Sequence, residues 1–220
     1  MSELSGTTYR DHARPQAIPV AQLLGQVMFL VAIALAFAAF GTWVGRDLEI
    51  GTARILSFAG FGMLLVSSFA GVRFRVGTFA MAWLFATAFV IGLGLGPVIA
   101  YLVENDPTVV TQAAGATALI VVGMGALGFA LSKDLARWMR PLSFIVFGAV
   151  LVSFVMVLFA SGGNPLLSVI IGGVSALLIA VDFNYLRKHG TEDDAIWLAT
   201  GIFVSIVNIF LALLNIFSSD

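Results

Sequence analysis

The sequence is dominated by seven long apolar runs that are separated by short polar segments. Crossing a hydrocarbon core of about 30 Å takes roughly 20 helical residues. A backbone in lipid must satisfy its own hydrogen bonds, so each run is predicted to be a helix. The predicted helices cover residues 20–45, 55–72, 77–103, 109–131, 141–160, 166–186 and 195–217.

The scarcity of charged residues supports a membrane location for these helices. Only 10% of the residues are charged and 60% are hydrophobic, whereas a soluble domain carries roughly 25% charged residues. The net charge of −1 gives no clustered basic surface for nucleic acid, and the absence of cysteine excludes disulfides and thiolate metal sites. The predicted class is therefore an all-α integral membrane protein, a bundle of seven transmembrane helices.

The polar segments define the domain organisation. Residues 1–19 are polar and are predicted to form a cytoplasmic tail. The apolar run that follows is long enough to span the membrane, so it is predicted to be the first membrane helix and not a cleaved signal peptide. No segment between the runs is long enough to fold separately. Residues 20–220 are therefore predicted to form one domain. Glycines at 92, 94 and 96 and at 123, 125 and 128 favour close helix packing.

The distribution of Lys and Arg predicts the orientation, because basic loops stay in the cytoplasm. With the N-terminus inside, nine of the eleven basic residues lie on the cytoplasmic side and two, Arg46 and Arg54, lie on the other. We therefore expect a cytoplasmic N-terminus and an outer C-terminus. The compact form without sorting signals suggests a bacterial cytoplasmic membrane.

Asp182 is the charged residue that falls within a predicted span, near the cytoplasmic end of the sixth helix. A charge within a span is costly and marks a candidate functional residue or metal ligand. Two interpretations stay open: an inward-facing site, or an interfacial carboxylate that reaches water. If Asp182 faces inward, Arg73 or Arg75 at the end of the second helix is the expected partner, in a latch that releases on protonation.

Other polar residues are candidates for a pathway through the bundle. Ser205 and Asn208 are three residues apart and share one face of the seventh helix, which fits either interhelical hydrogen bonding or the lining of a pore. Glu104 and Asp106 lie on the opposite side, where they could attract cations to an outer mouth. Neither histidine, His12 or His189, lies in a span, and no His-Glu-x-x-His pattern occurs. We therefore expect no enzymatic activity and no bound cofactor.

Four motifs occur in order along the chain and suggest a family. They are Gly94-Leu95-Gly96-Pro97-Val98, Ser132-Lys133-Asp134-Leu135, Val181-Asp182-Phe183-Asn184, and the segment 203–211 with sequence FVSIVNIFL. Together they make the chain resemble the transmembrane Bax inhibitor motif family, also called the Bax inhibitor or YccA-like family. The resemblance covers essentially the whole chain after the tail.

The resemblance implies a bundle with a central seventh helix and an association with calcium leak across membranes. In family members with that activity, two aspartates share a proton and pair with an arginine of the second helix, and the group is proposed to sense pH. The first aspartate corresponds to Asp182, and the arginine to Arg73 or Arg75. The position of the second aspartate is Ser205 here, so we expect the pH-gated calcium function to be weakened, altered or absent.

A small-molecule transporter would be favoured by inverted repeats, and the sequence has no clear internal repeat. Two functions are therefore considered further. The first is a passive leak channel for calcium or another cation, with calcium as the transported ion. The alternative is a membrane regulator that transports nothing and binds partners such as a membrane protease, as some bacterial members of the family are thought to do. Lipid is the expected surrounding in both cases.

Overall fold

The computed structural model describes residues 19–69, 71–159 and 164–218, so the prediction of a tail over residues 1–19 falls almost wholly outside the described residues. Seven long helices form the described chain, and each is long and apolar enough to cross a membrane. The all-α, seven-span class is thus confirmed. The helices are α1 (Val20–Val44), α2 (Ile50–Phe69), α3 (Gly77–Asn105), α4 (Pro107–Ala130), α5 (Ala136–Phe159), α6 (Pro165–Lys188) and α7 (Ala195–Phe217), with short 3-10 turns η1 (Val72–Phe74) and η2 (Glu192–Asp194).

Two helices begin earlier than the apolar runs predicted. Helix α2 starts at Ile50 rather than at residue 55, and α5 starts at Ala136 rather than at residue 141. Hydropathy locates the part of a helix that lies in hydrocarbon, whereas helical hydrogen bonding continues through polar residues such as Arg54 and Arg137. The predicted bounds of α7, residues 195–217, agree with the structure.

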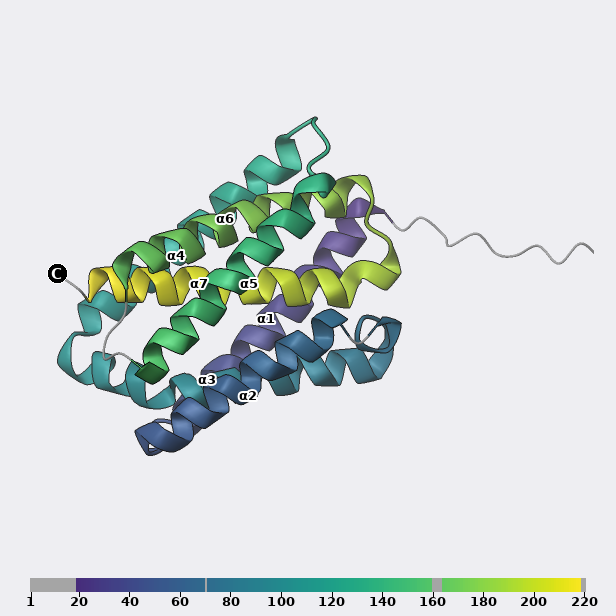
Figure 1. Ribbon diagram of the computed structural model, residues 1–220. Helices are drawn as coiled ribbons and strands as arrows, with labels where there is room; N and C mark the ends of the chain where they lie inside the picture. The colour runs from purple at the N-terminus through teal and green to yellow at the C-terminus, as the bar shows by residue number, and fades with distance from the viewer. Residues whose placement is uncertain (1–18, 70, 160–163, 219–220) are drawn as a thin grey trace, which may run out of the picture.

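Helix α7 occupies the centre of the bundle (Figure 1). It packs against α1, α4 and α6, and it also touches α3. Phe203, Ile202 and Ile209 on α7 are almost completely buried. The predicted central C-terminal helix is therefore confirmed. Outside this core, α3 packs on α1, α2 packs on α3, and α5 packs on α6.

Glycines permit the closest helix contacts. Gly92 on α3 faces the backbone carbonyl of Ala38 on α1, and Gly128 on α4 faces that of Ala180 on α6. A Cβ at either position would overlap the carbonyl oxygen. These contacts bring backbones together without any side chain between them, which is the packing that small residues allow in membranes.

The bundle has two ends, which we distinguish by the start of α1. At the N-terminal end, α1, α3, α5 and α7 begin and α2, α4 and α6 finish; this end lies on the right in Figure 1. The opposite end contains the end of α7 and the turn between α3 and α4. Asp182 falls in the last two turns of α6, near the N-terminal end.

Candidate functional site

The Asp182 carboxylate faces the interior of the bundle. Its residue is only 6% exposed, and its neighbours Ile179, Ala180 and Val181 are also buried. Across the interface lies Gly201 of α7, where a Cβ would stand 3.3 Å from Asp182 Oδ2. A glycine at this position therefore leaves room for the carboxylate between α6 and α7.

This carboxylate has no protein partner within the described residues. Neither a hydrogen bond nor an ion pair reaches it from any residue in 19–69, 71–159 or 164–218. A buried charge is costly unless it is paired or bound to an ion. Binding of a cation or a proton would therefore stabilise the buried carboxylate of Asp182.

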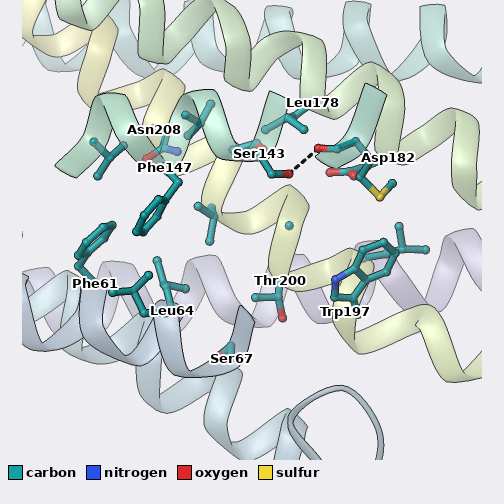
Figure 2. A pocket seen from close by; sticks show the side chains of 18 of the residues that line it. Phe61, Leu64, Ser67, Ser143, Phe147, Leu178, Asp182, Trp197, Thr200 and Asn208 are labelled. Carbon is teal, nitrogen blue, oxygen red and sulfur yellow. Dashed lines mark hydrogen bonds between the residues drawn. The ribbon is translucent and has the colours of Figure 1, made fainter. Parts of the chain in front are cut away.

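Asp182 lines a cavity of about 230 Å³ between α2, η1, α5, α6 and α7. Figure 2 shows the carboxylate at one side of this cavity near Trp197, with Phe61 and Phe147 at the other side. Most of the wall is apolar. The polar lining consists of Asp182 with Ser67, Ser143, Thr200, Ser205 and Asn208.

Three of the lining hydroxyls already donate to backbone carbonyls one turn earlier in their own helices. Ser67 Oγ donates to Met63 O at 2.9 Å, Ser143 Oγ to Met139 O at 2.7 Å, and Thr200 Oγ1 to Ile196 O at 2.8 Å. The Ser143 bond is the dashed line in Figure 2. Because the protons of these hydroxyls are used, only lone pairs remain to accept a hydrogen bond or coordinate a cation. Ser67 Oγ already accepts one hydrogen bond, from Trp83 Nε1 at 2.8 Å.

The structure brings together three of the residues singled out from the sequence. Asp182, Ser205 and Asn208 all line this cavity. Arg73 and Arg75 do not line it, and both are exposed on either side of Phe74. The guanidinium of Arg73 lies 5.1 Å from the ring centre of Phe79. The turn η1 directs Phe74 toward the cavity, and the two arginines form no ion pair with Asp182 in the part of the chain that the structure describes.

Glu104 and Asp106 lie at the opposite end of the bundle. Glu104 borders a surface hollow that also contains Arg46, Asp47 and Tyr101, and Arg46 Nε donates to Asp47 Oδ2 at 3.1 Å. Asp106 caps α4, since its Oδ1 accepts from the amide of Val109 at 3.3 Å. The capping role accounts for Asp106 without any cation.

No group of three His, Cys, Asp or Glu that could hold a metal occurs among the described residues.

Polar residues continue along the α6–α7 interface beyond the cavity. On α6, Ser168, Ser175 and Asp182 recur every seven residues, so they share one face. Antiparallel packing sets Asp182 beside Gly201, and Ser168 Oγ donates to Asn215 Oδ1 at 3.0 Å at the other end. The same register places Ser175 at the level of Asn208. Ser175 is fully buried, and its Oγ has no partner among the described residues.

Asn184 was not recognised from the sequence as a structural centre. It is completely buried, and its Nδ2 donates to the carbonyls of Gly128, Leu131 and Lys133, each at 3.1 Å. Its Oδ1 accepts from the amide of Leu135 at 2.9 Å. One side chain thereby fastens the α4–α5 loop to α6. Asn184 lies in the motif at 181–184, and two of its partners, Lys133 and Leu135, lie in the motif at 132–135. The spacing of the two motifs alone does not indicate that they touch.

The same loop carries a second contact to the end of α6. His189 Nε2 lies 2.7 Å from Asp134 Oδ2, and both side chains are about half exposed. A hydrogen bond from the Ala136 amide, and then the bond to His189, hold the pKa of Asp134 below its ordinary value of 3.8. His189, which lies outside the predicted spans, thus pairs with the α4–α5 loop.

The comparisons with known proteins agree with this architecture. The family model described as inhibitor of apoptosis-promoting Bax1 matches residues 20–220. An uncharacterized protein of Pseudomonas aeruginosa is 30% identical over 206 residues, which cover 90% of this chain and 89% of the relative. The modulator of FtsH protease YccA of Escherichia coli is 25% identical over 216 residues, covering 94% of each chain. An uncharacterized membrane protein of Vibrio cholerae is 24% identical over 214 residues, covering 94% of this chain and 93% of the relative.

The matched region includes every described helix and the cavity at Asp182. The resemblance noted from four short motifs is thus confirmed over nine-tenths of the chain. The chain is a multi-pass membrane protein that belongs to the Bax inhibitor family.

Proposed function

We propose that this protein is a passive cation leak channel in which Asp182 is the internal binding point for the ion. The observation that carries this proposal is a buried carboxylate on the wall of the cavity, which no other described residue pairs with. A fixed negative charge in a low-dielectric bundle lowers the energy of a cation that enters it. Intramembrane ionisable residues commonly mark such pathways.

The polar residues beyond the cavity support a continuation toward the opposite end. Ser205 and Asn208 line the cavity itself. Ser175, and then Ser168 with Asn215, follow along the same helix pair. Hydroxyl and amide oxygens offer a dehydrated cation weak, successive contacts, which suit conduction better than tight binding.

We place the protein in the cell membrane with its N-terminal end in the cytoplasm, on the basis of the nine-to-two distribution of Lys and Arg. In that orientation Asp182 is close to the cytoplasm. Arg73 and Arg75 lie outside the cavity, so a latch with Asp182 would require η1 to turn. Such a latch belongs to a second, closed conformation in this proposal.

The test is calcium flux into proteoliposomes at neutral and acidic pH. Flux should exceed that of empty liposomes and fall in Asp182→Asn, which keeps the side-chain shape and removes the charge. Acid should lower the flux of the native chain as Asp182 is protonated. Asp193→Asn is the matched control, because Asp193 is exposed on η2 and loses the same charge. Absence of flux from correctly folded and inserted protein, or equal flux in Asp182→Asn, would refute the proposal.

A second candidate function is a membrane regulator that binds a partner protein. The observation that favours it is the relative of Escherichia coli named as a modulator of FtsH protease. Under this alternative, the chain would co-purify with a membrane protease of its own cell and change the rate at which that protease degrades a substrate. The two functions are separated by Asp182→Asn, which should abolish flux but leave capture of the protease unchanged.

A further inference from the structure

We propose that the cavity at Asp182 is a binding site for a small organic ammonium ion, with the charged head at Asp182 and an apolar body toward Phe61 and Phe147. This inference rests on the proposed function, because it takes Asp182 as the cation-binding residue and adds the class of cation that binds there. Binding at the cavity is nevertheless measurable without any flux.

The charge of the site matches a monovalent cation. Asp182 contributes one negative charge, and no other Asp or Glu among the described residues lines the cavity. A buried ion pair is stable only when the charges balance and the geometry is good. A singly charged ammonium neutralises this carboxylate, whereas a divalent ion would leave an excess positive charge inside the bundle.

The oxygen content of the wall is too low for a resident calcium ion. Calcium takes six to eight oxygen ligands, commonly several of them carboxylates. Besides Asp182, the cavity offers neutral oxygens of Ser67, Ser143, Thr200, Ser205 and Asn208, which are distributed over α2, α5 and α7. An ammonium head needs far less, because one carboxylate and apolar or aromatic surroundings suffice for its recognition.

The aromatic residues of the wall fit the two parts of such a ligand. Trp197 lies at the Asp182 side of the cavity, and an indole face attracts a cation more strongly than other rings (Figure 2). Phe61 and Phe147 lie at the far side, stacked with 5.6 Å between ring centres. Leu64, Val146 and Val150 add apolar side chains to the wall of the cavity. The cavity is thus charged at one end and mainly aromatic and aliphatic at the other, where the amide of Asn208 also lies (Figure 2).

The proposed route of entry is from the bilayer, between α2 and α5. Phenylalanine rings bridge α2 and α5, with Phe58 and Phe61 on α2 and Phe147 and Phe154 on α5. Side-chain rotation is fast compared with movement of whole helices. A cation with an apolar body could therefore enter between these rings.

The experiment is isothermal titration calorimetry of the full chain in nanodiscs, with empty nanodiscs as the blank. The probe is benzyltrimethylammonium, which has a permanent charge and one ring. Tetramethylammonium keeps the charge without the ring, and benzyl alcohol keeps the ring without the charge. We expect benzyltrimethylammonium to bind more tightly than either, and Asp182→Asn to weaken it by at least about tenfold, since removing one partner of a buried charge pair is costly. Asp193→Asn should bind as the native chain does.

A second variant keeps the test decisive if Asp182→Asn does not fold. Phe147→Ala removes part of the apolar end and leaves the charged end intact. It should weaken benzyltrimethylammonium and leave tetramethylammonium unchanged. Equal effects on both probes would overturn the two-part site, and so would probe binding that is indifferent to Asp182→Asn in folded protein.

Failure of this inference is distinguishable from failure of the proposed function. Asp182-dependent calcium flux without any heat from benzyltrimethylammonium would overturn the ammonium site and leave the leak channel standing. Asp182-dependent binding of benzyltrimethylammonium without flux would support the ammonium site and refute conduction.

Discussion

Replacing Asn184 should be among the most damaging polar substitutions in this protein. Its side chain contacts one carbonyl oxygen of α4 and two carbonyl oxygens and one amide of the α4–α5 loop, at 2.9–3.1 Å, and is fully buried. An amide group has two N–H donors, so the three carbonyl contacts amount to about two full hydrogen bonds and the Leu135 contact adds a third.

The magnitude follows from the value of each bond. Interhelical hydrogen bonds in a membrane protein average about 0.6 kcal/mol, and buried hydrogen bonds in soluble proteins contribute about 1 kcal/mol. Three bonds then give about 2 to 3 kcal/mol for Asn184→Ala. Asn184→Asp should cost more than Asn184→Ala, because a carboxylate cannot donate and would be repelled by the three carbonyls.

The assay is reversible unfolding in mixed micelles, followed by helix content as the fraction of denaturing detergent rises. Asn105→Ala is the matched control, since Asn105 is exposed and donates one bond to Tyr101 O at 2.8 Å. It should change the unfolding free energy by less than about 0.5 kcal/mol. The reasoning fails if Asn184→Ala and Asn105→Ala have equal effects, or if Asn184→Asp is as stable as the native chain.

Three further predictions concern packing, acid sensitivity and orientation. Gly92→Ala should destabilise the protein by more than about 2 kcal/mol in the same unfolding assay, because its Cβ would overlap Ala38 O, whereas Gly115→Ala, which meets nothing within 4 Å, should not. The lowered pKa of Asp134 means that its stabilising contribution is present above 3.8 and is lost as the pH falls through its folded-state pKa; thermal unfolding of Asp134→Asn should therefore lose part of the acid sensitivity of the native chain. Reporter fusions in a bacterial host should place the N-terminus in the cytoplasm and the C-terminus outside, and the reverse result would refute the orientation.

The helices could be predicted because each depends on local composition. Seven runs of apolar residues are sufficient to predict seven spans in lipid, and the polar residues on either side of α7 also set its bounds. The starts of α2 and α5 could not be predicted in this way. Hydropathy carries no signal for a helical turn that projects beyond the hydrocarbon.

The candidate site was predictable only where its residues share one helix. Ser205 and Asn208 lie three residues apart, so their common face follows from helical geometry. The contact of Asp182 with Gly201 depends on the packing of α6 against α7, and the sequence pattern does not reveal which helices are neighbours. The same limit applies to Asn184, whose partners lie about 50 residues earlier. The exposure of Arg73 and Arg75 depends on the turn of η1, which the sequence pattern also leaves open.

Ser205 is the position at which we expect the charge of the preferred ion to be set. It is 3% exposed and lines the same cavity as Asp182, at the position where the family resemblance places a second aspartate. One carboxylate balances a monovalent ion, and two balance a divalent ion while adding charged oxygens to its ligand set. Ser205→Asp should therefore raise the affinity for calcium and lower the affinity for benzyltrimethylammonium relative to that for calcium. Calorimetry at neutral pH measures both affinities. Ser205→Asn is the matched control, since it adds a similar side-chain volume without charge. Thr87→Asp is not used as a control, because Thr87 is buried in the core. If Ser205→Asp and Ser205→Asn shift the two affinities alike, volume rather than charge controls the cavity, and the assignment of valence to this residue is wrong.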